Sequence, residues 1–287
     1  MRPTIRPVTL KRIIELVNFS LENSNKSVSD FQNKFDLSDD RAKSIIAESR
    51  RLDLIKEDIL EPTEQGEAFS TAASNSDWEE LSSILERSSP HYSSYLEVLE
   101  RTDEALTEEQ ILGKLQTGSE ELKYNKTGFS VLSDWGERLG ITQRNVFTEK
   151  YYKVNEDQKI NSPAEEIEKS YEELQSEAGL NLKQRYVSIP ELREAFCEEY
   201  RLPRDNFDQL LTALHKANIG KMELSGAPLD TQAKKSDISI KRMEKAGDGG
   251  ITTTKMSSDQ ILRGLQLENG KVYYYIAIFN SLNEVQN

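Results

Sequence analysis

Few residues of this 287-residue chain could do covalent or metal chemistry, and their spacing argues against it. His91 and His215 are the only histidines, and neither has a second soft ligand at the spacing of a metal site. Cys197 is the single cysteine and has no local histidine partner, so we expect a thiol packed in the core. The sequence therefore predicts a protein that is not an enzyme and uses no metal or cofactor.

Two other patterns that can signal a catalytic or ligand site also favour plain surface. The run Gly247-Asp248-Gly249-Gly250 lacks the strand and the Lys-Ser/Thr of a phosphate loop, so it indicates a flexible loop. Adjacent glutamate pairs such as Glu108-Glu109 point about 100° apart on a helix and do not converge on one ligand. We expect these pairs to lie on a solvated surface.

Basic and hydroxyl side chains, in contrast, gather where a nucleic-acid backbone could be held. A helix predicted from Ser38 to about Leu52 carries candidate base contacts in its first half and candidate phosphate contacts at its end. The preceding helix and the turn that follows add further cations. The candidate DNA contacts of this segment are Lys34, Arg41, Lys43, Ser44, Arg50, Arg51 and Lys56. The alternative is a solvated amphipathic helix, in which Asp39 and Asp40 serve the helix dipole and repel phosphate.

The surrounding pattern predicts the elements that would position this helix. Apolar residues of Val8–Leu21 recur at the spacing of one helical face. We expect Ser29 to cap a short helix that ends near Phe35, and Asp36-Leu37 to form a tight turn. Ala42, Ile45 and Ile46 would face inward from the next helix. Two short strands, 54–55 and 59–60, are expected before Thr63–Gly66 opens another helix.

This order of helix, helix, turn, helix and short apolar runs resembles the winged-helix superfamily. A phrase like LT–x–x–G commonly follows the wing there, and Thr63–Gly66 stands at that place. The resemblance covers about 65 residues and rests on pattern. It implies that the second helix of the pair enters the major groove of double-stranded DNA.

A related order recurs twice along the chain. Asn125–Gly140 predicts a helix closed by Gly140, with strands at Ile141 and Val146–Val154, and resembles second winged-helix modules of archaeal and bacterial regulatory or defence proteins. Its candidate DNA contacts are Lys126, Thr127, Ser130 and Arg144. A winged helix that packs against protein is the equal alternative for this module.

The third module is predicted after a charged helix at 164–178. Pro190 would begin a helix, Asp205 would cap the next, and Lys271–Phe279 would be the central strand of a small sheet. Acidic residues beside Arg204 favour a protein contact for this module. A long basic loop at about 226–267 is expected within it, with Lys234, Lys235, Lys241 and Arg242 as candidate DNA contacts or as part of a plain insertion.

Charge is unevenly spread along the chain. The net charge is −13, and residues 67–120 hold twelve Asp and Glu against three Lys and Arg. Residues 1–66 are close to neutral. An acidic connector suits a basic protein partner, whereas a nearly neutral flank can present a basic face to DNA.

These patterns predict an α+β protein, mainly helical with small β-hairpins. Tandem winged helices are expected at 1–70, at 71–160 together with the helical connector, and at 161–287. We expect it to bind double-stranded DNA as a transcription regulator or as the DNA-engaging subunit of a larger complex. The alternatives are a protein adaptor, for instance in an antiviral defence complex, and a dimerising repressor. No apolar stretch is long enough to span a membrane, no secretory signal is visible, and one cysteine fits a reducing interior, so a cytoplasmic location is expected.

Overall fold

Along most of the chain, the segments whose apolar residues recur at helical spacing form helices. The computed structural model describes residues 4–22, 27–118, 121–177, 186–226, 240–245, 251–256 and 261–285. Within these residues the protein is mainly helical, with small antiparallel strand pairs. The expected α+β class is therefore confirmed. None of the described helices has both the length and the apolar composition that crossing a bilayer requires.

The chain divides into two compact units. The first comprises residues 1–142 with 241–255, and the second comprises 143–240 with 256–287. This division differs from the domain boundaries that the sequence pattern led us to expect near residues 70 and 160. The reason is that α4 (Glu64–Asn75) packs against both α1 (Leu10–Glu22) and α5 (Trp78–Ser88), which leaves no separable segment near residue 70.

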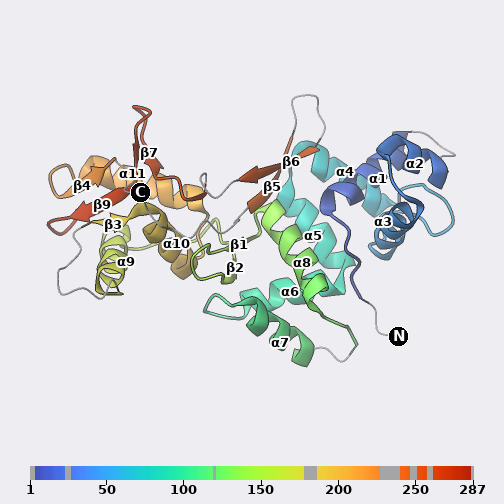
Figure 1. The fold of residues 1–287 in the computed structure, drawn as a ribbon, viewed down its shortest axis with the longest axis horizontal. Helices are drawn as coiled ribbons and strands as arrows, with labels where there is room; N and C mark the ends of the chain where they lie inside the picture. Colours follow the sequence, from blue (N-terminus) through green and yellow to red (C-terminus); the bar gives the residue numbers. More distant parts are fainter. Residues whose placement is uncertain are drawn as a thin grey trace. The chain divides into compact units, whose positions relative to one another are not determined.

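The first helices of unit 1 form around an aromatic cluster. α1 packs against α3 (Asp39–Arg51) and α4, and α2 (Val28–Phe35) packs against α3 (Figure 1). Phe31 is fully buried, with its ring centroid 5.4 Å from that of Phe19 and 5.1 Å from that of Phe35. The cap of α2 is Ser27 rather than the predicted Ser29, because Ser27 and Asp30 bond to each other's backbone N–H groups.

The segment between α3 and α4, residues 52–63, is an irregular turn rather than the two expected strands. A single antiparallel bridge joins Ile55 to Pro62, and the Lys56 amide donates to the Glu61 carbonyl at 2.9 Å. A proline at the pairing position cannot donate a ladder hydrogen bond, so the pairing does not extend. The Thr63 side chain then caps α4 by accepting from the Gly66 amide at 3.0 Å.

Four helices complete the helical part of unit 1. They are α5, α6 (Pro90–Glu100), α7 (Glu108–Gly118) and α8 (Lys126–Leu139). Trp135 of α8 is fully buried beside Tyr92, and its indole N–H donates to the Val8 carbonyl at 3.2 Å. The predicted cap at Gly140 is confirmed, because this residue ends α8 at a φ of 76°. At the start of α7, Thr107 and Gln110 bond reciprocally, each side chain accepting from the other's backbone N–H group.

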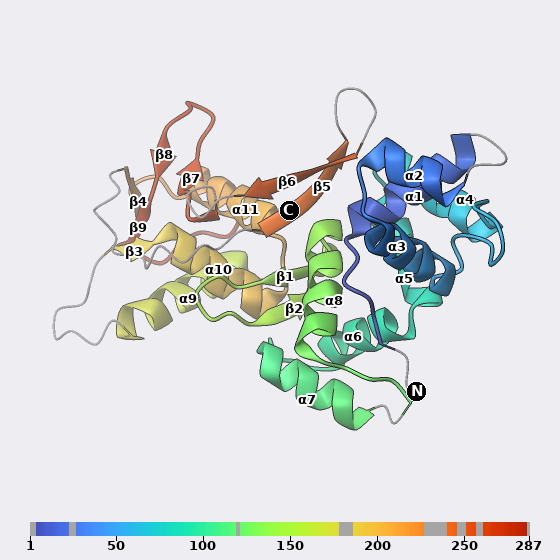
Figure 2. The ribbon, with the colours of Figure 1, turned by 45° about the vertical axis from the view of Figure 1, so that its right-hand side comes forward.

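Part of the expected loop 226–267 is instead a strand pair. β5 (Ile240–Lys245) pairs with β6 (Ile251–Met256), and most of this hairpin belongs to unit 1, where it lies beside α8 (Figure 2). The β-branched run Ile251–Thr254 explains the strand, because such side chains fit a pleated surface. The polar character of the region hid this signal.

The larger described elements of unit 2 are helices and a three-stranded sheet. The helices are α9 (Pro163–Glu177), α10 (Ile189–Tyr200) and α11 (Arg204–Ala217). The sheet has the order β3 (Val187–Ser188), β9 (Tyr275–Ile278), β4 (Met222–Ser225), and both neighbours run antiparallel to β9. The last strand is central as predicted, but it covers only Tyr275–Ile278 of the expected Lys271–Phe279, because Val272–Tyr273 belong to a separate strand pair. Val187 pairs with Ile276 and Met222 with Ile278, so apolar side chains lie on the same rungs.

Two small hairpins add to unit 2, and two local predictions are wrong there. β7 (Leu265–Gln266) pairs with β8 (Val272–Tyr273), and β1 (Thr142–Arg144), which starts at the last residue of unit 1, pairs with β2 (Tyr151–Lys153). The strand expected to start at Val146 starts at Tyr151, because residues 146–148 turn around the Asn145 side chain. Asp205 lies inside α11, whose cap position is Pro203.

Candidate nucleic-acid interface

The turn before α3 determines which face of that helix meets solvent. Asp36 ends α2 in the left-handed conformation, with a φ of 49°, and the chain enters α3 through Ser38. Ala42, Ile45 and Ile46 then face the core and are almost completely buried, as predicted. The opposite side of α3 is therefore left as an outward face.

The first half of that face carries three of the predicted DNA contacts. Arg41 and Lys43 are exposed and Ser44 is half-buried. The Lys43 ammonium lies 2.5 Å from the Asp39 carboxylate. This hydrogen bond raises the pKa of Lys43, and together with one from Gln32 it lowers the pKa of Asp39. Both side chains are more than half exposed, so the pair is a surface ion pair of small energetic value.

Both arginines in the last turn of α3 bond to other groups of the protein. Arg50 donates from Nε to the Lys56 carbonyl at 3.1 Å and so fastens the turn to the helix. Arg51 pairs with Glu48, whose side chain is fully buried. Arg51 is thus the predicted contact least available for phosphate, because without it the buried carboxylate keeps only the more distant Arg6, at 4.0 Å.

The two flanking cations are paired on the surface. Lys34 lies 2.6 Å from the Glu22 carboxylate, and Lys56 lies 2.9 Å from that of Glu61. All four side chains are more than a third exposed. Such pairs contribute about 0–1 kcal/mol, so a phosphate group can replace the carboxylate at little cost.

A shallow pocket of about 340 Å³ adjoins the start of α3. It is formed by the segment 7–9, α1 and α3, with the guanidinium groups of Arg12 and Arg41 in its lining together with Asp40. Arg12 pairs with Glu15 at 2.7 Å. The Asp40 carboxylate opposes an anion in this pocket, so the pocket adds no separate phosphate site.

The predicted contacts on α8 are only partly grouped. Lys126, Thr127 and Ser130 are exposed in its first turns, after an Asn125 cap. The remaining helix is mostly buried. Arg144 belongs to unit 2, where its guanidinium lies 5.8 Å from the Tyr151 ring centroid.

The hairpin of β5 and β6, which carries the predicted contacts Lys241 and Arg242, packs against α8. Lys241 pairs with Asp134 at 3.3 Å, and Arg138 donates to the Thr253 hydroxyl at 2.8 Å. Arg242 is half-buried. Lys234 and Lys235 lie outside the described residues.

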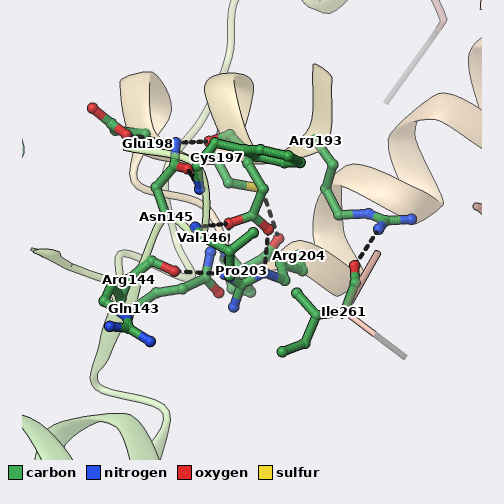
Figure 3. A network of polar contacts seen from close by, with 12 residues as sticks. Gln143, Arg144, Asn145, Val146, Arg193, Cys197, Glu198, Pro203, Arg204 and Ile261 are labelled. Atoms are coloured by element: carbon green, nitrogen blue, oxygen red, sulfur yellow. Dashed lines mark hydrogen bonds and ion pairs between the residues drawn. The ribbon is translucent and has the colours of Figure 1, made fainter. Parts of the chain in front are cut away.

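A buried charged network in unit 2 was missed by sequence reasoning. Glu194 and Arg204 pair with side chains only 1% and 7% exposed, and Arg204 also donates to the Arg144 carbonyl at 2.7 Å (Figure 3). Glu194 accepts from the Val146 amide at 3.0 Å. The signal in the sequence is that Arg193-Glu194 interrupts the inward positions Leu192 and Phe196. Charged groups at core positions require such partners.

The side chains considered for catalysis or metal binding have structural roles instead. Cys197 is fully buried, which raises its pKa, and its thiol contacts the Pro203 carbonyl at 3.7 Å. The prediction of a packed core thiol is confirmed. In the described part of the chain, no three or more His, Cys, Asp or Glu side chains gather in a way that could hold a metal ion.

Scans against protein-family models, curated proteins and solved structures each found no match to this chain.

Proposed function

We propose that this chain binds double-stranded DNA through a winged helix formed by α1, α2, α3 and the turn 52–63, with α3 as the helix that enters the major groove. The order of these elements supports this, as does the packing of α1 and α2 against α3. The turn that follows α3 stands where a wing belongs, and Arg50 holds it to the helix.

One observation carries the proposal: the outward face of α3 combines cations with small side chains. Ser44 and Ala47 leave room for a groove edge, and Arg41 and Lys43 lie at the same end of the helix. Their neighbours Lys34 and Lys56 pair with carboxylates in exposed ion pairs, and the Lys34 ammonium also lies 5.6 Å from the ring centroids of Phe19 and Phe35. Phosphate can displace those carboxylates at little cost, which makes both ammonium groups available to DNA.

We further propose that the chain is a tandem winged-helix protein. The order α6, α7, α8, β1, β2 repeats helix, helix, helix, hairpin. In unit 2 the order is α9, β3, α10, α11, β4, β9, with β9 paired between the other two strands. One strand of this sheet follows the first helix and two follow the third, and this arrangement supports the resemblance drawn from the sequence. On this proposal the protein is a regulator or the DNA-engaging subunit of a larger complex.

The test is a charge-reversal titration on duplex DNA at low salt, followed by fluorescence anisotropy. Arg41→Glu with Lys43→Glu should abolish binding, because it reverses two charges on the face of α3. The matched control is Arg101→Glu with Lys114→Glu, which reverses two exposed charges of unit 1 outside the proposed winged helix. Control binding should change by less than about twofold.

The outcome separates specific docking from general attraction. Binding by the parent should weaken steeply as salt increases, since each neutralised phosphate releases about one counterion. Equal losses in both double variants, or none in the first, would show that α3 is not the DNA-binding element.

A protein adaptor is the second candidate, and one observation favours it. α8, the helix of the second repeat that would enter DNA, is covered by β5 and β6 through the Lys241–Asp134 and Arg138–Thr253 contacts. A helix used for internal packing is not available to a groove. If the parent protein shows no affinity for random duplex DNA at low salt but remains bound to a co-purified partner, the adaptor function is favoured.

A further inference from the structure

The strongest unassigned feature of unit 2 is a pocket with an aromatic side chain at its edge. It encloses about 390 Å³ between α9, α10 and the loop between β1 and β2. Phe147 of that loop is among its lining residues and is 43% exposed. Leu174 and Ala195 add apolar surface to the lining.

Hydrogen bonds fix the backbone of the loop that carries Phe147. The Asn145 side chain accepts from the amides of Phe147 and Thr148, at 2.8 and 3.2 Å. The Val146 amide donates to the buried Glu194 carboxylate, and the Thr148 hydroxyl donates to Glu198 at 2.7 Å.

Packing fixes the same loop from its inner side. Val146 is buried with Ile240 and Ile261 in a small apolar cluster. Glu149 is held in the left-handed conformation, with a φ of 59°, which a non-glycine residue adopts only where its surroundings require it. The loop backbone is therefore fixed in advance, while the ring of Phe147 stays partly in solvent.

An exposed aromatic on a fixed backbone costs little entropy when it is buried by a partner. Aromatic side chains, phenylalanine included, are enriched in the buried core of protein interfaces. The buried Glu194–Arg204 pair, which holds the loop on α10, thus has a consequence at the surface: it keeps Phe147 in one place.

The charges around the pocket decide which partner fits. Four glutamates line it against one lysine, and that lysine, Lys169, also lies 4.0 Å from Glu166. Glu198 is already bound by Asn145 and Thr148. The remaining three carboxylates, Glu173, Glu191 and Glu199, are exposed around the apolar lining. This arrangement repels nucleic acid and attracts cations.

We propose that this pocket docks a short segment of another protein in which an apolar side chain is flanked by lysine or arginine. The apolar side chain would pack on Phe147 and Leu174, and the flanking cations would pair with Glu173 and Glu199. The lining of α10 extends from Glu191 to Glu199, which is about 12 Å along a helix and matches three to four residues of extended chain. This interaction is separate from the proposed DNA binding.

The test uses the full chain as bait for random seven-residue peptides displayed on phage. Selected peptides are then synthesised with a fluorescent label, and their dissociation constants are measured by anisotropy. We expect sequences in which Lys or Arg flanks Leu, Ile, Met or an aromatic residue. Phe147→Ser and Glu173→Lys should each weaken the binding of such peptides at least tenfold.

Glu172→Lys is the matched control, because it makes the same charge change at the neighbouring exposed residue outside the pocket. It should change the affinity by less than about twofold. The proposal is overturned if no peptide is enriched, or if the enriched peptides are acidic. It is also overturned if Glu172→Lys weakens binding as much as Glu173→Lys does. Duplex DNA should not displace the peptide, so this result and the DNA result stand independently.

Discussion

Arg50 in the last turn of α3 donates a hydrogen bond from its Nε to the backbone carbonyl of Lys56, at 3.1 Å. This contact joins the proposed DNA-entering helix to the turn that would act as its wing. Lys56 in turn pairs with Glu61 across the same turn. The two elements that would touch DNA are therefore mechanically linked through one guanidinium.

Replacing Arg50 should loosen the turn without unfolding unit 1. Arg50→Ala removes one hydrogen bond from a charged donor, which we expect to cost about 1–2 kcal/mol of stability. Amide hydrogen exchange at Ile55 and Lys56 should speed up, and DNA affinity should fall. Arg50→Lys keeps the charge and should restore DNA affinity only in part, since lysine lacks the planar geometry. Unchanged exchange at Lys56 would contradict the linkage.

Removing the acidic partner of a DNA-facing cation should strengthen DNA binding. Glu61→Gln frees Lys56 and removes one negative charge from the turn, so we expect affinity for duplex DNA to rise about two- to fivefold at low salt. Glu64→Gln makes the same change at an exposed position in the first turn of α4 and serves as the control. Anisotropy titrations of both variants check this. A larger gain in the control would place the DNA elsewhere.

Gly66 should not tolerate a side chain. A Cβ built on Gly66 would lie 2.1 Å from the Leu54 carbonyl oxygen, which is backbone and cannot move aside easily. We expect Gly66→Ala to destabilise unit 1 by about 1–3 kcal/mol. Gly113→Ala in α7 meets nothing within 4 Å and should stabilise the protein by up to about 1 kcal/mol. Urea denaturation of the two variants measures the difference, and equal effects would be inconsistent with this packing.

The buried pair in unit 2 should be far more sensitive than the surface pairs. Glu194→Gln leaves the Arg204 guanidinium buried without its counter-charge, which we expect to cost about 3–5 kcal/mol. Asp208→Asn should cost less, because Arg193 also donates to the Ile261 and Arg263 carbonyls. Denaturation monitored by circular dichroism tests this order, and the reverse order would contradict it.

His215 gives the stability of unit 2 a dependence on pH. Burial lowers the pKa of His215 in the folded state, whereas the unfolded chain titrates near its ordinary value of about 6.5. Below that pH the unfolded state binds a proton that the folded state does not, so stability falls until the pH is below the folded pKa. His215→Gln should show a weaker decline between pH 7.5 and 5.5 in urea titrations. An identical decline would rule out this group as a cause.

The elements built from local patterns could be predicted from the sequence. Apolar spacing predicted α1, α3 and α8 nearly to their ends, and Gly140 and Thr107 marked helix boundaries correctly. These features depend on residues three or four apart, which the sequence displays directly.

Contacts between distant residues could not be predicted in this way. The pairing of Lys241 with Asp134 and of Glu194 with Arg204 depends on packing that joins separate segments. The set of side chains available to contact DNA differs from the predicted set for the same reason. Arg51 was chosen from its position on a helix, but it pairs with the fully buried Glu48, and a helical pattern does not reveal which charges are buried.

The path of the chain through its two units bears on inheritance. Residues 241–255 return to the first unit after residues 143–240 have built most of the second. A recombination event that transferred residues 1–142 alone would leave α8 without the strands that engage Asp134 and Arg138. The two units are therefore poorly suited to exchange as separate cassettes.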